Sequence, residues 1–199
     1  PDDFNIQQGH NRFTWNLRYP SNTIPAEDGQ NFFGAFAGPM AVPGSYQVRL
    51  TLGDYSETQA LELKTDPRVE QIGVTIEDMQ AQLEYNLEVR DALGIADRMV
   101  AQMDTLRNHL TSNGDDAMSN PSPEMQRLNN LYDRLVSSEE GSYMPPMLID
   151  QLGYLYRMTI SSDQRPGNEA YNRFEFLSEE LENIQDEWER LRRSIEIPD

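Results

Sequence analysis

The sequence predicts an α+β protein in which a small antiparallel β unit precedes an antiparallel bundle of about four helices. Two observations support this fold class. Apolar residues alternate with polar ones in several segments before Thr65, and beyond it they recur every three or four residues. We therefore divide the chain into a β unit at residues 1–68 and an acidic helical bundle at residues 69–199.

Three segments of the β unit have the pattern of strands. Residues 12–18 place Phe13, Trp15 and Leu17 on one face, which predicts a strand buried on that side. Residues 46–52 alternate in the same way, and the dipeptide at 53–54 is a hairpin signal that leads into a return strand around 61–64. The pattern favours a β-sandwich-like unit with its apolar faces turned inward.

Such a sandwich has about seven strands, more than these segments supply. A fourth strand at residues 4–6 fits the pattern but does not close the gap. Either the long connection at 19–43 contains further strands, or sequence upstream completes the sheet. The chain starts at Pro1 with neither a Met nor a signal peptide, and we expect the natural N-terminus to lie upstream.

The connection between the first two strands carries the aromatic cluster Phe32, Phe33 and Phe36. Connections of this length inside a compact unit are uncommon and often form interfaces. The three rings either cover the open end of the unit's own sandwich or form a docking surface for a preceding domain.

The helical part begins at Thr75, where residues 75–78 resemble a capping box, and its first helix is expected to reach Ser112. A second helix is predicted from Ser122 and a third after Pro146. The fourth should run from near Pro166 to Pro198. Its apolar residues step by three and four, so they form a near-heptad seam. The seam consists of Phe174, Leu177, Leu181, Ile184, Trp188 and Leu191.

The formal net charge of -18 makes nucleic acid and anionic lipid unfavourable partners, because both are polyanions. No stretch of 18 apolar residues is present, so we expect no membrane span. The absence of cysteine rules out disulfides and thiol chemistry.

No pattern in the sequence predicts a catalytic, cofactor or metal site. The two histidines, His10 and His109, belong to no metal-binding motif, and the last turn of a helix is a favourable place for His109. The carboxylates after Glu175 fall mostly off the seam, where they are solvated or paired with arginines. We expect this chain not to be an enzyme.

Two long segments of the β unit resemble elements of a known family. They read Gly9-His10-Asn11-Arg12-Phe13-Thr14-Trp15-Asn16-Leu17-Arg18-Tyr19-Pro20 and Gly38-Pro39-Met40-Ala41-Val42-Pro43-Gly44-Ser45-Tyr46-Gln47-Val48-Arg49-Leu50. Both are similar to segments found late in large bacterial proteins with a sortilin-type, Asp-box-containing β-propeller, often labelled glycosyl-hydrolase-like. Residues 66–68 are similar to the exit from the family's Ig-like domain, and residues 78–91 and 180–191 are similar to its helical tail.

The resemblance implies an Ig-like plus helical region behind one or two propellers in a secreted, periplasmic or cell-surface bacterial protein. The family's Asp-box repeats are absent from these 199 residues, so no catalytic residue carries over. The fold analogy behind the hydrolase label does not establish an activity.

Three functions follow as hypotheses. The favoured one is a non-catalytic accessory module, whose β unit docks on the upstream propeller and whose helices bind another protein or a second copy. The alternative is a part of a glycan-degrading enzyme that contributes carbohydrate binding. Aromatic rings would then stack on sugars, the candidates being Trp15, Phe32, Phe33, Tyr143 and Tyr154. The third is a stand-alone helical adaptor.

Overall fold

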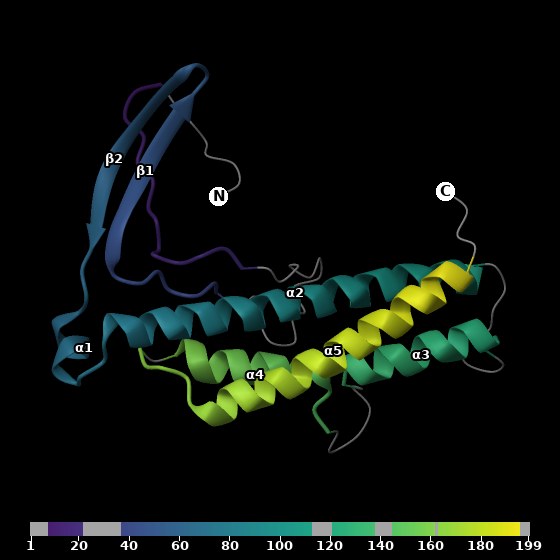
Figure 1. Cartoon of the computed structure of the whole chain (residues 1–199). Coiled ribbons are helices and arrows are strands. Elements are labelled where there is room, and N and C mark those ends of the chain that lie inside the picture. The colour runs from purple at the N-terminus through teal and green to yellow at the C-terminus, as the bar shows by residue number, and fades with distance from the viewer. Residues whose placement is uncertain (1–7, 22–36, 113–120, 138–144, 162, 196–199) are drawn as a thin grey trace.

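A computed structural model describes residues 8–21, 37–112, 121–137, 145–161 and 163–195. Within these ranges the chain is mixed α+β, with a two-stranded antiparallel sheet followed by five helices (Figure 1). The elements are β1 (Gly44–Leu52), β2 (Tyr55–Leu63), α1 (Pro67–Gln71), α2 (Ile76–Ser112), α3 (Pro123–Leu135), α4 (Leu148–Ile160) and α5 (Asn168–Ser194).

The strands β1 and β2 form a hairpin that projects from one end of the helical part (Figure 1). Gly53 lies in the turn with a φ of 57°, a conformation that glycine adopts without steric cost. Tyr46 pairs with Leu61 and Leu52 with Tyr55, so the apolar residues of both strands share one face. The hairpin and its register agree with the alternating sequence pattern.

The prediction of a strand at residues 12–18 is wrong. This segment forms a single bridge, between Arg18 and Met40, and Leu17 has a φ of 60° that breaks the pleat. Asn16 explains the break locally, because its side-chain oxygen accepts a hydrogen bond of 3.1 Å from the Arg18 amide and closes a turn. Trp15 is 43% exposed, so the alternation does not mark a buried face.

Capping residues fix the starts of two helices as the sequence predicts. At α2 the Asp78 amide donates to the Thr75 hydroxyl over 3.1 Å, and the Thr75 amide donates to the Asp78 carboxylate over 3.2 Å. At α3 the Ser122 side chain accepts from the Met125 amide, with Pro123 at the first helical position. Asp66 caps the short α1 in the same way, ahead of Pro67, although the periodicity of the sequence did not reveal this helix.

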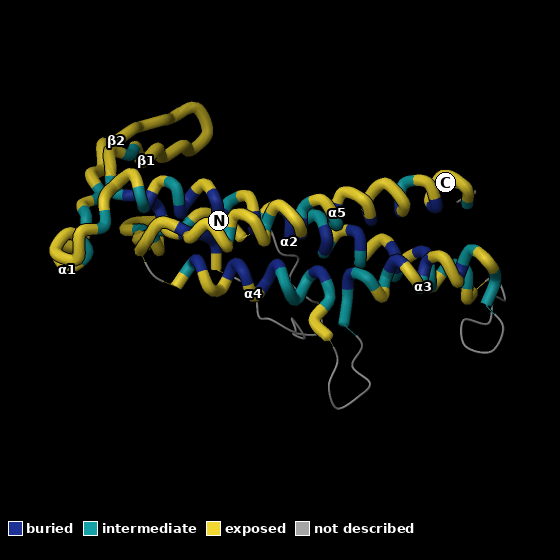
Figure 2. The backbone as a smooth tube through the Cα atoms, turned by 60° about the horizontal axis from the view of Figure 1, so that its bottom comes forward, coloured by how far each residue is buried: buried dark blue, intermediate teal, exposed yellow. Residues whose placement is uncertain are grey.

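The helix α2 is the spine of the bundle, with 37 residues and a length of about 55 Å. It runs unbroken through the buried Gly94 and contacts α3, α4 and α5. Figure 2 shows the core-facing turns of the helices in dark blue. The core includes Tyr85, Val89, Met103, Leu128, Leu152 and Tyr156.

The seam of α5 faces this core. Leu177, Leu181, Ile184, Trp188 and Leu191 are buried, and Phe174 packs against the cluster while half-buried. The bundle thus has one main hydrophobic core that α2, α3, α4 and α5 share, and a smaller cluster joins Val42 to Met79 and Leu83 of α2. None of the described residues of β1 and β2 belongs to either cluster.

Candidate functional site

The β1–β2 hairpin carries a row of exposed apolar side chains on one of its two faces. We call this surface the hairpin face. Its apolar side chains are Tyr46, Val48, Leu50, Leu52, Tyr55, Leu61 and Leu63, and the polar Glu57 and Gln59 of β2 lie on the same face, opposite Leu50 and Val48. The opposite face is polar, with Arg49 paired with Thr58 and Ser45 with Glu62. This is the pattern of a sheet that is covered on one side.

Nothing within the described residues covers the outer part of the hairpin face. Val48 and Leu50 are each 55% exposed and Leu52 is 61% exposed, so we must correct the expectation that these side chains point into a core. Both strands are exposed along nearly all their length (Figure 2). An isolated two-stranded hairpin is marginally stable in water, which makes an open apolar face of this length unusual.

The hairpin's hydrogen-bonding edges are also unpaired. Among the residues that the structure describes, β1 pairs only with β2, so each strand leaves one edge without a neighbour. Such an edge presents backbone donors and acceptors that a further strand can pair with. The hairpin therefore offers one apolar face and two β edges.

The base of the hairpin face is partly covered by the segment before it. The Trp15 ring meets the Tyr46 ring edge to face, with centroids 5.6 Å apart, and the Trp15 indole donates to the Arg18 carbonyl over 3.1 Å. Burial, helped by the nearby Tyr19, raises the pKa of the Tyr46 hydroxyl above its ordinary value. Tyr46, at the base of the hairpin face, is therefore partly shielded from solvent.

Backbone hydrogen bonds join the base of the hairpin to the segment before it. The Tyr19 amide donates to the Pro39 carbonyl over 2.9 Å, and the Ala41 amide donates to the Leu17 carbonyl over 2.8 Å. Gly38 is required here, because a Cβ at this position would lie 1.7 Å from the Tyr19 carbonyl oxygen.

The paired segments are fixed to the helices by three further contacts. Val42 is buried with Met79 and Leu83 of α2. The Arg90 guanidinium donates to the Pro20 carbonyl, and the Tyr156 hydroxyl donates to the Ala37 carbonyl, each over 2.9 Å. The hairpin is thus attached to the bundle through its base rather than through the exposed part of its face.

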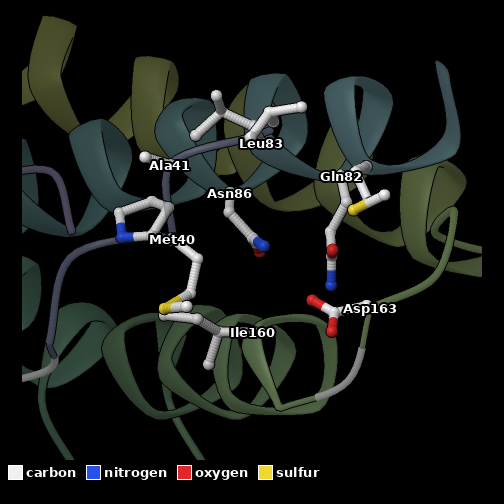
Figure 3. A pocket seen from close by; sticks show the side chains of 10 residues that line it. Met40, Ala41, Gln82, Leu83, Asn86, Ile160 and Asp163 are labelled. Atoms are coloured by element: carbon white, nitrogen blue, oxygen red, sulfur yellow. The ribbon is translucent and has the colours of Figure 1, made fainter. Parts of the chain in front are cut away.

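A small cavity lies at this attachment, between residues 39–42 and the helices α2 and α4 (Figure 3). Its free volume of about 30 Å³ suits one water molecule and is too small for an organic ligand. Thr159 donates to the Asn86 side chain over 2.6 Å, and Gln82 donates to the Thr159 carbonyl over 2.5 Å. These buried groups satisfy one another, so they stabilise the join and do not form a binding site.

Of the predicted docking and sugar-stacking residues, Trp15 and Tyr154 lie in the described part of the chain. Phe32, Phe33, Phe36 and Tyr143 lie outside the described residues. Trp15 meets Tyr46 edge to face, while Tyr154 is exposed on α4. Three or more potential metal-ligating side chains gather nowhere in the described part of the chain. In the same part, no helix is long and apolar enough to cross a membrane.

Fold and site together define a mixed α+β chain with a helical bundle and a partly uncovered β-hairpin. Comparison with protein-family models, curated proteins and solved structures finds no match.

Proposed function

We propose that this chain is a non-catalytic interaction module of a larger protein. In this proposal the hairpin face docks on a β-sheet of the same polypeptide and the helical bundle forms a rigid acidic arm. The observation that carries it is the row of exposed apolar side chains on one hairpin face, with Val48, Leu50 and Leu52 each more than half exposed. Burying such side chains contributes about 1.5–3 kcal/mol each, a strong drive for docking.

A sheet is the partner that fits this surface best. Along β1 the hairpin face has the regular two-residue apolar alternation that stacks against another sheet about 10 Å away, and the free edges of β1 and β2 can extend a sheet by hydrogen bonding. The Ig-like sandwich predicted from the sequence would be completed by such strands.

The size of the surface favours a partner in the same chain. Strands of nine residues make a two-stranded face roughly 30 Å long and 10 Å wide, or about 300 Å². Two copies stacked through it would bury about 600 Å² in total, well below the roughly 1,200 Å² of a stable interface between separate molecules. A covalent link supplies a high effective concentration, so a small patch suffices.

The family resemblance makes an upstream β-propeller the expected source of that sheet, and an extracytoplasmic location belongs to the same proposal. The bundle's charge supports an extended solvated arm, because residues 66–199 contain 27 acidic and 12 basic side chains.

Paired substitutions in the protein encoded by the full open reading frame test the proposal. The double variant Val48→Glu/Leu50→Glu charges the hairpin face, whereas Gln47→Glu/Thr51→Glu adds the same charge to the opposite face. In the 199-residue chain both variants should melt within a few degrees of the parent, since all four side chains are exposed. In the full protein only Val48→Glu/Leu50→Glu should make the hairpin sensitive to limited proteolysis, because only this variant places charge on the docked face.

Two results would contradict the proposal. One is equal protease sensitivity of the two double variants in the full protein. The other is an open reading frame that encodes no β domain besides these residues.

A further inference from the structure

A groove of about 390 Å³ lies between α3 and α5, far from the hairpin in the fold (Figure 1). Its volume falls within the usual range of small-molecule sites, about 300–1,000 Å³. The residues that shape it are Arg127, Leu131, Arg134, Glu187, Arg190 and Leu191.

Helical spacing explains why these residues meet. Arg127, Leu131 and Arg134 lie four and three residues apart on α3, so they share one face of that helix. Glu187 and Arg190, three residues apart, share a face of α5, and Leu191 follows beside them. The two leucines are buried, whereas Arg127, Glu187 and Arg190 are exposed.

The charge of the groove is opposite to that of the chain. The chain as a whole has a formal net charge of -18, yet three guanidinium groups and a single carboxylate line this groove. Arg127 makes no hydrogen bond or ion pair with another described residue, and Arg190 donates to the backbone carbonyl of Asp186 over 3.1 Å. Arginines left without carboxylates in so acidic a chain concentrate positive potential at this place.

The third arginine is held in a fixed position. Arg134 donates to the Glu180 carboxylate over 2.8 Å and to the Glu187 carboxylate over 3.0 Å. These bonds use three of its N–H groups, counting the 3.2 Å bond from Nε to Glu180. A guanidinium has five N–H donors, so two remain for a ligand. Because Glu180 and Glu187 already fix the Arg134 side chain, binding a ligand would cost it little further conformational entropy.

We propose that the α3–α5 groove binds a small amphipathic anion, with a carboxylate or phosphate head between Arg127, Arg134 and Arg190 and an apolar body on Leu131 and Leu191. Guanidinium groups recognise both heads through paired, charge-assisted hydrogen bonds. Asn130 at the groove wall adds an amide that can donate or accept. This inference does not depend on the docking of the hairpin.

Calorimetric titration of the 199-residue chain tests the proposal with three probes that share an aromatic body. Phenyl phosphate and phenylacetate carry the two alternative heads, and benzyl alcohol carries no charge. We expect saturable binding of at least one anion, at one site per chain, with a Kd on the order of 1 mM or below. The better anion identifies the head group that the groove prefers.

Substitution of the two exposed arginines locates the site. Arg127→Gln/Arg190→Gln should weaken binding about tenfold or more, since both charge-assisted hydrogen-bond donors to the anionic head are lost. Arg68→Gln/Arg173→Gln removes the same charge from α1 and from the start of α5, and it should leave the affinity within about twofold.

The proposal is overturned if neither anion gives a saturable signal or if benzyl alcohol binds as tightly as the anions. It is also overturned if the two double variants lose the same affinity, because binding would then follow net charge rather than the groove. None of these three results bears on the hairpin face.

Discussion

The indole Nε1 of Trp188 on α5 donates a hydrogen bond of 3.1 Å to the side-chain oxygen of Gln102 on α2. The Trp188 side chain is 2% exposed, so a polar contact accompanies a large apolar one at the centre of the bundle. The pair shows how α5 is held in register against the spine.

Replacing Trp188 with alanine should lower the free energy of unfolding by about 3–5 kcal/mol, because it removes a buried ring and leaves a cavity. Trp188→Phe should lower the free energy of unfolding by less, because it removes the hydrogen bond to Gln102 but leaves only a small cavity. Glu189→Ala is the neighbouring control, since its carboxylate pairs at 3.5 Å with the partly exposed Arg192 and the largely exposed Arg193. That control should cost less than about 1 kcal/mol in urea melts. Equal losses at 188 and 189 would mean that the seam of α5 is wrongly assigned.

Replacing Asp97 with asparagine should stabilise the protein at neutral pH. Burial raises the pKa of Asp97 to about 6, although the nearby Arg98 opposes the shift. In the unfolded chain the group has a pKa of about 3.9. Between about pH 3.9 and about 6 the folded state therefore binds more protons than the unfolded state. The free energy of unfolding falls as the pH rises through this range.

We expect Asp97→Asn to raise the free energy of unfolding by about 1 kcal/mol at pH 7, after discounting for solvent screening at this partly exposed site. The gain should be near zero at pH 3, which lies below the pKa of Asp97 in both states. Urea melts at both pH values check this, with Glu182→Gln, an exposed acid on α5, as the control. A gain of the same size at both values would exclude titration of Asp97 as the cause.

Gly38→Ala should detach the base of the hairpin from residues 17–20. The added Cβ would lie 1.7 Å from the Tyr19 carbonyl oxygen, so the two backbones must separate at a cost of about 1–3 kcal/mol. Hydrogen exchange at the Tyr19 and Ala41 amides should accelerate. Gly44→Ala is the matched control, because its Cβ would meet nothing within 4 Å. Unchanged exchange in Gly38→Ala would contradict the described attachment.

Sodium chloride should raise the melting temperature of the 199-residue chain at neutral pH. The 27 acidic side chains of residues 66–199 outnumber the 12 basic ones, and outer helix faces lie within about one Debye length, ~10 Å at 0.1 M salt. Exposed pairs such as Arg193 with Glu189 oppose this effect only weakly, at about 0.3–0.5 kcal/mol each. Melting in low salt and in roughly 0.5 M chloride is the measurement, and a flat or falling value would show that repulsion is not dominant.

Local signals in the sequence predict much of this fold, because caps and periodicity act within a few residues. Thr75 with Asp78 and Ser122 before Pro123 mark the starts of α2 and α3. The alternation at residues 46–52, the turn signal at 53–54 and the return strand around 61–64 predict the hairpin. The stepping of α5 likewise identifies the side chains that lie in the core.

Burial in the β unit could not be predicted from the same signals, because alternation shows which residues share a face and not what covers it. Trp15 and Leu50 both sit in alternating segments, and both are substantially exposed. The groove between α3 and α5 was missed for a related reason. The four-residue and three-residue spacing from Arg127 to Arg134 was a readable signal, but its meeting with Arg190 depends on helix packing.

Hydrogen exchange of the β1 and β2 amides tests the central claim most directly, when it is measured in the 199-residue chain and in the full-length protein under the same conditions. If the hairpin face docks on a sheet of the same polypeptide, amides along both strands should exchange at least about tenfold more slowly in the full-length protein, while the core of α2 changes little. Equal exchange of β1 and β2 in the two proteins would contradict the proposal that this face is an interface.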